Sequence, residues 1–125
     1  MPPIYYNSRD AACKTPFGAV RAGETVTLRL TVPEDHGYVD PHLVLTKDKE
    51  TPVHYRMNFE GQTPGVNHFV MELTLDQPGL YFYYFDLYTD FRKVFRGEHG
   101  EGELSWVPGE QWQLTVYERD FATPD

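Results

Sequence analysis

The fold of this chain is decided by residues 76–88, DQPGLYFYYFDLY. The first four residues are types that form tight turns. The aromatic and apolar run that follows is typical of a β-strand. Tyr81 follows the turn and stands two residues before the next core position, which is the spacing of a tyrosine corner in a β-sandwich. We therefore predict that Tyr81, Tyr83 and Phe85 point into a core.

The same strand is apolar on its other face as well. Successive side chains of a strand point to opposite faces, so Leu80, Phe82 and Tyr84 are predicted on the outer face of a sheet, with Tyr88 beyond them. A soluble domain rarely leaves such a patch bare. Two explanations are open: the loops or an edge strand of this chain cover the patch, or another part of a larger protein or a second subunit packs there.

The segments on both sides of this strand have the same character. Residues 24–32 alternate cleanly, with Val26, Leu28, Leu30 and Val32 on one face. Further strands are predicted at 39–46, 53–59, 67–75, 80–88, 91–95, 104–107 and 112–117, with a possible edge strand at 4–6. No segment has the length and 3.6-residue period of a helix. We predict an all-β fold, an immunoglobulin-like antiparallel β-sandwich of about seven to nine strands.

Composition and charge limit the possible partners. The 125 residues are enough for one domain. A formal net charge of −8 repels phosphate backbones and anionic lipid, so neither nucleic acid nor membrane is expected as a partner. Cys13 is the only cysteine, which excludes an internal disulfide and a zinc site built on paired thiolates. Since the sequence shows no signal peptide and no bilayer-spanning stretch, we expect a cytoplasmic protein.

The last predicted strand, at 112–117, leads into a segment typical of a domain junction. Residues 118–125 contain Phe121 and Pro124 and have no soluble, charged tail. We expect residues 1–125 to form a single N-terminal domain, with residues 118–125 starting the linker to a further domain.

Four stretches resemble one known module: Ile4 and Tyr5 followed by Asp10, residues 24–30, residues 79–84, and residues 112–117 continuing to Asp120, Phe121 and 123–125. This module is the N-terminal domain of bacterial alpha-amylase family enzymes, glycoside hydrolase family 13. The similarity is greatest to the neopullulanase, cyclomaltodextrinase and maltogenic amylase type. It covers essentially the whole chain, although residues 39–65 match only in strand rhythm.

The resemblance implies that this chain alone is not an enzyme. In such enzymes the catalytic carboxylates belong to a barrel, which here would lie beyond Asp125. The parent protein would be a glycosidase, and no cofactor is implied. Three roles are described for this type of domain: a starch-binding module, a dimer contact that covers the active site of a neighbour, and a packing platform. All three remain open.

The residues themselves offer little catalytic or metal-binding chemistry. Asp86 and Asp90 are the only acids near the aromatic strand, and a solvated strand end explains both. The histidines lack the spacing of a metal motif. Three glutamates around His99 in a Gly-rich loop do not have the spacing of an EF-hand calcium loop; they are Glu98, Glu101 and Glu103. We predict no catalytic residue and no metal site.

Sugar binding needs flat aromatic faces and planar hydrogen-bonding groups. Trp106 precedes the turn at residues 107–109, which favours exposure, whereas Trp112 alternates with Leu114 and Val116, which favours the core. The candidate carbohydrate-binding residues are Trp106, Tyr88, Phe91, Phe95 and Trp112, and the candidate interface residues are Leu80, Phe82 and Tyr84.

These observations lead to one main hypothesis and two alternatives. The main hypothesis is a non-catalytic N-terminal domain of an alpha-glucan-degrading hydrolase that serves packing, oligomerisation and substrate gating. Its partners would be the catalytic domain of the same chain, a second copy in a homodimer, and alpha-glucan. One alternative is an autonomous starch-binding module. The other, an adhesion-type sandwich, rests on fold analogy alone.

Overall fold

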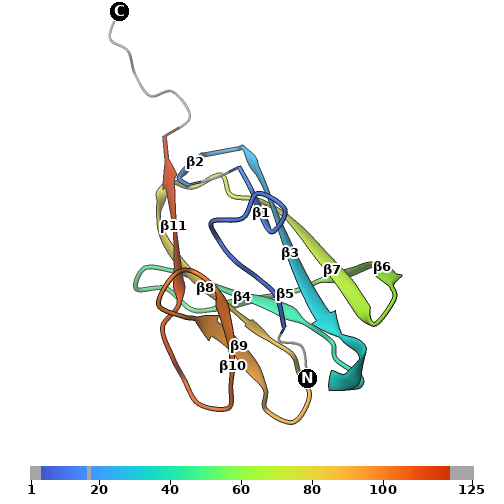
Figure 1. The fold of residues 1–125 in the computed structure, drawn as a ribbon. Coiled ribbons are helices and arrows are strands. Elements are labelled where there is room, and N and C mark those ends of the chain that lie inside the picture. Colours follow the sequence, from blue (N-terminus) through green and yellow to red (C-terminus); the bar gives the residue numbers. More distant parts are fainter. Residues whose placement is uncertain (1–3, 17, 119–125) are drawn as a thin grey trace, which may run out of the picture.

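The computed structural model describes residues 4–16 and 18–118, which form two β-sheets packed face to face (Figure 1). The first sheet has the strand order β1-β3-β7-β6. Its strands are β1 (Lys14–Thr15), β3 (Thr25–Pro33), β7 (Val66–Thr74) and β6 (Asn58–Thr63). All of its pairs are antiparallel, and the long pair β3 and β7 forms its centre.

The second sheet has β8 at its centre. It consists of β2 (Val20–Arg21), β4 (His42–Lys47), β5 (Val53–Arg56), β8 (Gly79–Asp86), β9 (Lys93–Arg96), β10 (Gly102–Ser105) and β11 (Trp112–Tyr117). One edge of β8 pairs with β4, which pairs with β5, and the other edge pairs with β11 and then β9. The predicted β-sandwich is confirmed, with one departure from antiparallel pairing: β2 lies parallel to β11.

The strand β8 has the side-chain pattern predicted from its sequence. Tyr81, Tyr83 and Phe85 are at most 5% exposed, and the Tyr81 hydroxyl donates a 2.8 Å hydrogen bond to the Gln77 carbonyl. This is the tyrosine corner. Tyr83 and Phe85 pack with Tyr6 and Trp112 in an aromatic cluster at the centre of the core.

The N-terminal segment contributes to the core without forming the predicted edge strand. Tyr5 makes only an isolated antiparallel bridge to Thr31 of β3. Tyr6 is nevertheless fully buried, and its hydroxyl lies 2.6 Å from the Tyr83 hydroxyl. The strands β1 and β2 were not predicted, because two residues are too few to show a period. The described helical structure is one 3-10 turn, η1 (Glu34–His36).

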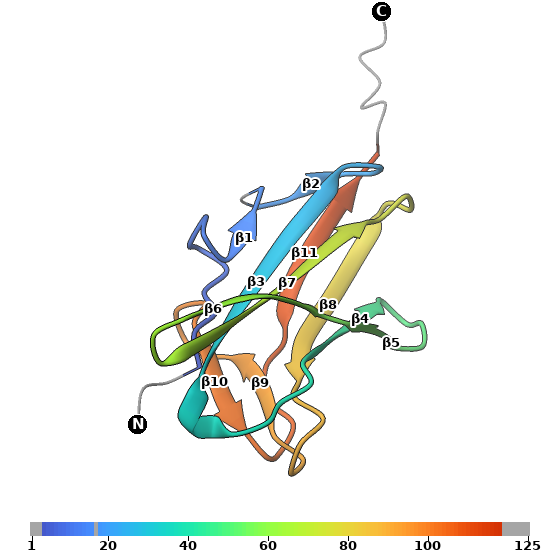
Figure 2. The ribbon, with the colours of Figure 1, turned by 90° about the vertical axis from the view of Figure 1, so that its right-hand side faces the viewer.

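The single strand predicted at 53–59 is wrong. The chain pairs with β4 up to Arg56, leaves the second sheet at Met57, and then pairs with β7 in the first sheet. Figure 2 shows this crossing, with β5 and β6 at opposite sides of the molecule. Met57 is buried, and its N–H donates to the Pro41 carbonyl at 2.9 Å. Phe59, which lies in phase with the buried Met57 in the predicted strand, is 60% exposed.

The two ends of the sandwich differ. The strand β11 finishes at one end, and the loop between β8 and β9 and the loop between β10 and β11 lie at the other (Figure 1). The predicted linker, including Phe121 and Pro124, lies outside the described residues except for Glu118. Within the described part of the chain, no helix has the length and apolar character needed to cross a membrane.

Candidate functional site

Three of the predicted carbohydrate-binding side chains are exposed at the loop end of the sandwich. Trp106 is 60% exposed, Tyr88 51% and Phe91 82%. They share this end because Lys93 at the start of β9 pairs with Asp86 at the end of β8 and with Ser105 at the end of β10. Trp106 follows Ser105 directly, so the sheet register brings the two predicted platforms to neighbouring loops.

The Tyr88 ring is fixed by two histidines. His42 of β4 stacks on the ring with centroids 3.8 Å apart and an interplanar angle of 11°. His54 of β5 is hydrogen-bonded through Nδ1 to the Tyr88 hydroxyl at 2.6 Å. Tyr88, Asp90 and Phe91 all have positive φ, between 54° and 58°. Non-glycine residues seldom adopt this conformation, and here it turns Tyr88 and Phe91 outward around a small cleft that also includes Lys93.

The other two predicted carbohydrate-binding residues are not available to a ligand. Trp112 is 1% exposed, and its indole N–H donates to the Gly100 carbonyl at 2.9 Å. Phe95 is 6% exposed, because it stacks on Tyr84 at 4.7 Å and lies beneath Gly109, where an added Cβ would be 3.1 Å from the Phe95 Cβ. The structure therefore corrects the inclusion of these two residues: neither ring has a free face for a sugar.

The outer face of β8 is only partly covered by the chain itself. Leu80, Phe82 and Tyr84 are all half-buried. Tyr84 is covered by Phe95 and lies opposite Val44 of β4, which is 1% exposed. The first explanation therefore holds for the Tyr84 end of the patch, which the chain itself shelters, while Phe82 stays open to a groove.

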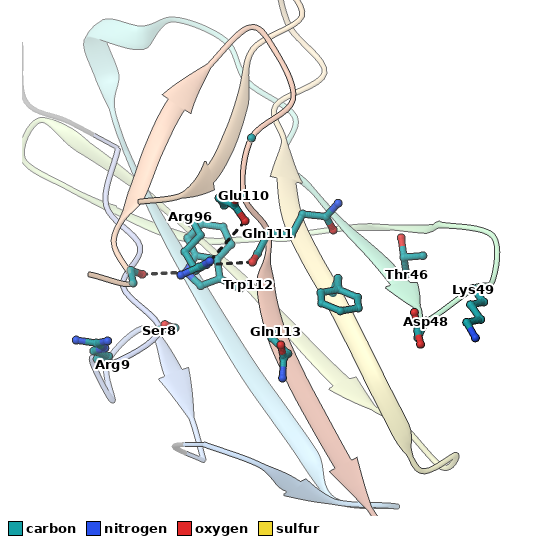
Figure 3. A pocket seen from close by; sticks show the side chains of 13 residues that line it. Ser8, Arg9, Thr46, Asp48, Lys49, Arg96, Glu110, Gln111, Trp112 and Gln113 are labelled. Carbon is teal, nitrogen blue, oxygen red and sulfur yellow. Dashed lines mark hydrogen bonds and ion pairs between the residues drawn. The ribbon is translucent and has the colours of Figure 1, made fainter. Parts of the chain in front are cut away.

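The groove around Phe82 has a volume of about 750 Å³. Phe82 lies between Thr46 of β4 and Gln113 of β11, which are its partners in the register. Figure 3 shows Gln113 on one side, Thr46, Asp48 and Lys49 on the other, and Ser8 and Arg9 at the rim. We call this site the outer-face groove.

One wall of the outer-face groove is a polar cluster around Arg96. Arg96 donates through Nε to the Gln111 carbonyl at 3.1 Å, and its Nη2 lies 3.6 Å from a carboxylate oxygen of Glu110 (Figure 3). The Gln111 Oε1 atom is buried and has no hydrogen-bond partner within the described part of the chain. A buried acceptor without a partner costs free energy.

Several of the remaining titratable groups have partners within the fold. Asp86 accepts the backbone N–H of Tyr88 at 2.9 Å. His68 lies between the Thr31 and Thr63 hydroxyls. Burial raises the pKa of the Cys13 thiol, which disfavours a reactive thiolate. Among residues 4–16 and 18–118, no three His, Cys, Asp or Glu side chains lie close enough together to hold a metal ion.

Two strongly exposed aromatic residues were missed by sequence reasoning. Tyr38 is 75% exposed and Phe59 is 60% exposed. The position of Tyr38 after Gly37, in a connection rich in Pro and Asp, was an available signal for exposure. No comparable signal existed for Phe59, since the alternation of residues 53–59 indicates a single strand.

Comparison with known proteins finds that the chain is similar to segments of amylopullulanases. It is 29% identical over 135 aligned residues to an amylopullulanase from Thermoanaerobacter thermohydrosulfuricus and 28% identical to one from Thermoanaerobacterium thermosulfurigenes. Each alignment covers 98% of this chain. The predicted resemblance to alpha-amylase family enzymes is confirmed. No family model matches the chain.

The similar proteins are far longer than this chain. It spans 9% of the first amylopullulanase and 7% of the second. Among solved structures, a cyclomaltodextrinase chain matches with a TM-score of 0.58 at 13% identity over 90% of this chain and 19% of its own length. That match concerns the fold alone. The chain therefore aligns with one domain-sized segment of much larger amylopullulanases.

Proposed function

We propose that this chain is a non-catalytic domain of an alpha-glucan-degrading glycoside hydrolase, and that its main role is packing against the rest of that enzyme. The proposal is supported by the amylopullulanase relatives, of which the chain spans under a tenth. The parent enzyme carries the catalytic groups elsewhere, in a domain that follows residue 125.

The observation that carries the packing role is the half-covered outer face of β8. Phe82 forms the floor of a groove whose rim contains both Arg9 and Lys49 as well as Asp48. Charges of both signs around an apolar centre are typical of a protein interface with a polar rim. The occupant we propose is the catalytic domain of the same chain.

The packing role is tested in the longer parent enzyme. Phe82→Gln removes the apolar floor without adding charge, and we expect it to lower the midpoint of thermal unfolding of the parent and to raise the rate at which protease separates the two domains. A second copy of this chain as the occupant would instead give a dimer that Phe82→Gln dissociates. A parent enzyme that is insensitive to the substitution would contradict both packing hypotheses.

A second candidate function is alpha-glucan binding at the loop end. The specific observation in its favour is Trp106, whose large ring is 60% exposed beside Val107, itself 65% exposed. Exposed tryptophan is uncommon in a soluble domain without a partner, and its flat face suits a pyranose ring. Tyr88, fixed by His42 and His54, supplies a second rigid ring at the same end.

This second function is tested by titrating the 125-residue chain with maltoheptaose while recording tryptophan fluorescence. Trp112 is buried, so a change in emission would come mainly from Trp106. We expect a saturable change that Trp106→Ala abolishes. An unchanged spectrum at millimolar ligand would count against glucan binding at Trp106. The cytoplasmic location and a gating role also remain proposals, which cell fractionation and kinetics of the parent enzyme can test.

A further inference from the structure

We propose that a second cleft, at the point where the chain crosses between the two sheets, binds a neutral saccharide chain. This crossing cleft is lined by Tyr38, Asp40, Arg56, Asn58, Phe59 and Asn67, among others, and has a volume of about 450 Å³. That volume is within the range of ordinary small-ligand sites. The choice of an alpha-glucan as ligand rests on the proposed parentage, an alpha-glucan hydrolase.

The first ring of the cleft, Phe59, is turned outward by the crossing itself. Met57 is anchored in the core, and the pairing of β6 with β7 shifts register between Phe59 and Gly61. Such bulges redirect side chains and are common beside binding sites. Phe59 makes an edge contact with Phe69, with ring centroids 5.7 Å apart at 69°. The Phe59 ring therefore contacts Phe69 at one edge and remains 60% exposed.

The second ring, Tyr38, projects from a short segment held at both ends. Gly37, with φ 76°, donates its N–H to the Glu34 carbonyl at 3.0 Å and ends the 3-10 turn. On the other side, Val39 is buried and Asp40 donates its N–H to the Leu87 carbonyl at 3.0 Å. The backbone on both sides of Tyr38 is thus fixed while the side chain is 75% exposed. A backbone that is already ordered adds little to the conformational entropy that is lost when a ligand binds.

The polar groups of the cleft match a hydroxylated and uncharged ligand. Arg56 and Asp40 form an ion pair with Nε and Oδ1 2.9 Å apart, so their charges compensate each other. Asn58 and Asn67 contribute two amides, each of which can both donate to and accept from a hydroxyl group. Two exposed rings together with planar amides and a compensated ion pair make the combination that pyranose recognition requires. An anionic ligand would find no net positive charge there.

The inference is tested by NMR on the 125-residue chain titrated with maltoheptaose, following the side-chain amide resonances of Asn58 and Asn67. We expect saturable shifts of these signals. Tyr38→Ala and Phe59→Ala are each expected to weaken the response by about tenfold. Phe59→Trp, which keeps a flat ring, is expected to retain it. Both alanine variants remove exposed groups, so the thermal unfolding curve serves to verify that they fold.

The control variant is Tyr5→Ala. Tyr5 is 44% exposed and does not line the crossing cleft, so its removal should leave the Asn58 and Asn67 shifts unchanged. If Trp106→Ala abolishes the response to maltoheptaose while Tyr38→Ala and Phe59→Ala leave it unchanged, the chain binds glucan at Trp106, and the proposed binding at the crossing cleft is refuted. If the wild-type chain shows no shift at about 10 mM ligand, both binding proposals fail, while the packing role is unaffected.

Discussion

At the scale of single residues, the fold depends on tyrosine hydroxyl groups that find partners inside the molecule. The Tyr81 hydroxyl bonds to the Gln77 carbonyl, and the Tyr6 and Tyr83 hydroxyls bond to each other in the centre of the core. Burial raises the pKa of both Tyr6 and Tyr83 well above the ordinary value. The role of Tyr81 could be predicted from its spacing after the turn. The pairing of Tyr6 with Tyr83 could not, since 77 residues separate them.

Replacing Tyr81 by Phe tests the tyrosine corner. The change removes one hydroxyl and leaves the ring in place, so we expect the free energy of unfolding to fall by about 1 kcal/mol, the usual net value of one hydrogen bond. Urea unfolding followed by fluorescence measures it. The matched control is Tyr38→Phe, which removes a hydroxyl from a ring that is 75% exposed. Equal effects of the two substitutions would show that the corner bond contributes nothing.

The hydrogen bond of the Tyr5 hydroxyl predicts that Tyr5 loses its proton at a higher pH than an ordinary tyrosine. Its 2.5 Å hydrogen bond to Asp10 is the main cause that raises the pKa of Tyr5 from 10.0 to about 12. The folded chain therefore keeps a proton that the unfolded chain loses, and this contribution to stability is present below pH 10 and lost as the pH rises towards 12. Asp10→Asn should lower the pKa of Tyr5, as measured by NMR titration of its ring. A Tyr5 pKa that does not change in Asp10→Asn would contradict this assignment.

At the scale of strands, alternation predicted the segments that stay in one sheet. The strands β3, β8 and β11 have the predicted buried and exposed faces, because each of them stays in one sheet along its whole length. Residues 53–59 alternate equally well, yet the chain changes sheets at Met57. The alternation of side chains carries no information about which sheet supplies the hydrogen bonds. The outward position of Phe59 was therefore beyond what the sequence pattern could predict.

The crossing at Met57 predicts losses of stability of different size for two phenylalanines that are paired in the sheet register. Phe69→Ala removes a ring that is 8% exposed and should cost about 3 kcal/mol of unfolding free energy. Phe59→Ala removes a ring that is 60% exposed and should cost less than about 1 kcal/mol, from the loss of its edge contact. Chemical denaturation of both variants measures the difference. Similar large losses would place Phe59 in the core, as the simple alternation predicts.

At the scale of the whole molecule, the sandwich presents three surfaces with different chemistry. The outer-face groove has an apolar floor and charges of both signs, the loop end carries Trp106, Tyr88 and Phe91, and the crossing cleft carries Tyr38 and Phe59. The sequence predicted the exposure of Trp106 from the turn that follows it. Phe95 was wrongly included among the binding residues. The side-chain pattern within one strand does not show that residues of other segments, Tyr84 and Gly109, cover its ring.

The central claim is that the outer face of β8 is a packing surface for the parent enzyme. The most direct measurement is the thermal unfolding midpoint of Phe82→Gln, determined both in the 125-residue chain and in the longer parent, with Phe91→Gln as the control on another surface. Because Phe82 is half-buried in this chain, we predict a small decrease there and a clearly larger one in the parent. Equal decreases in the two proteins would contradict the claim, since the face would then have no partner in the parent enzyme.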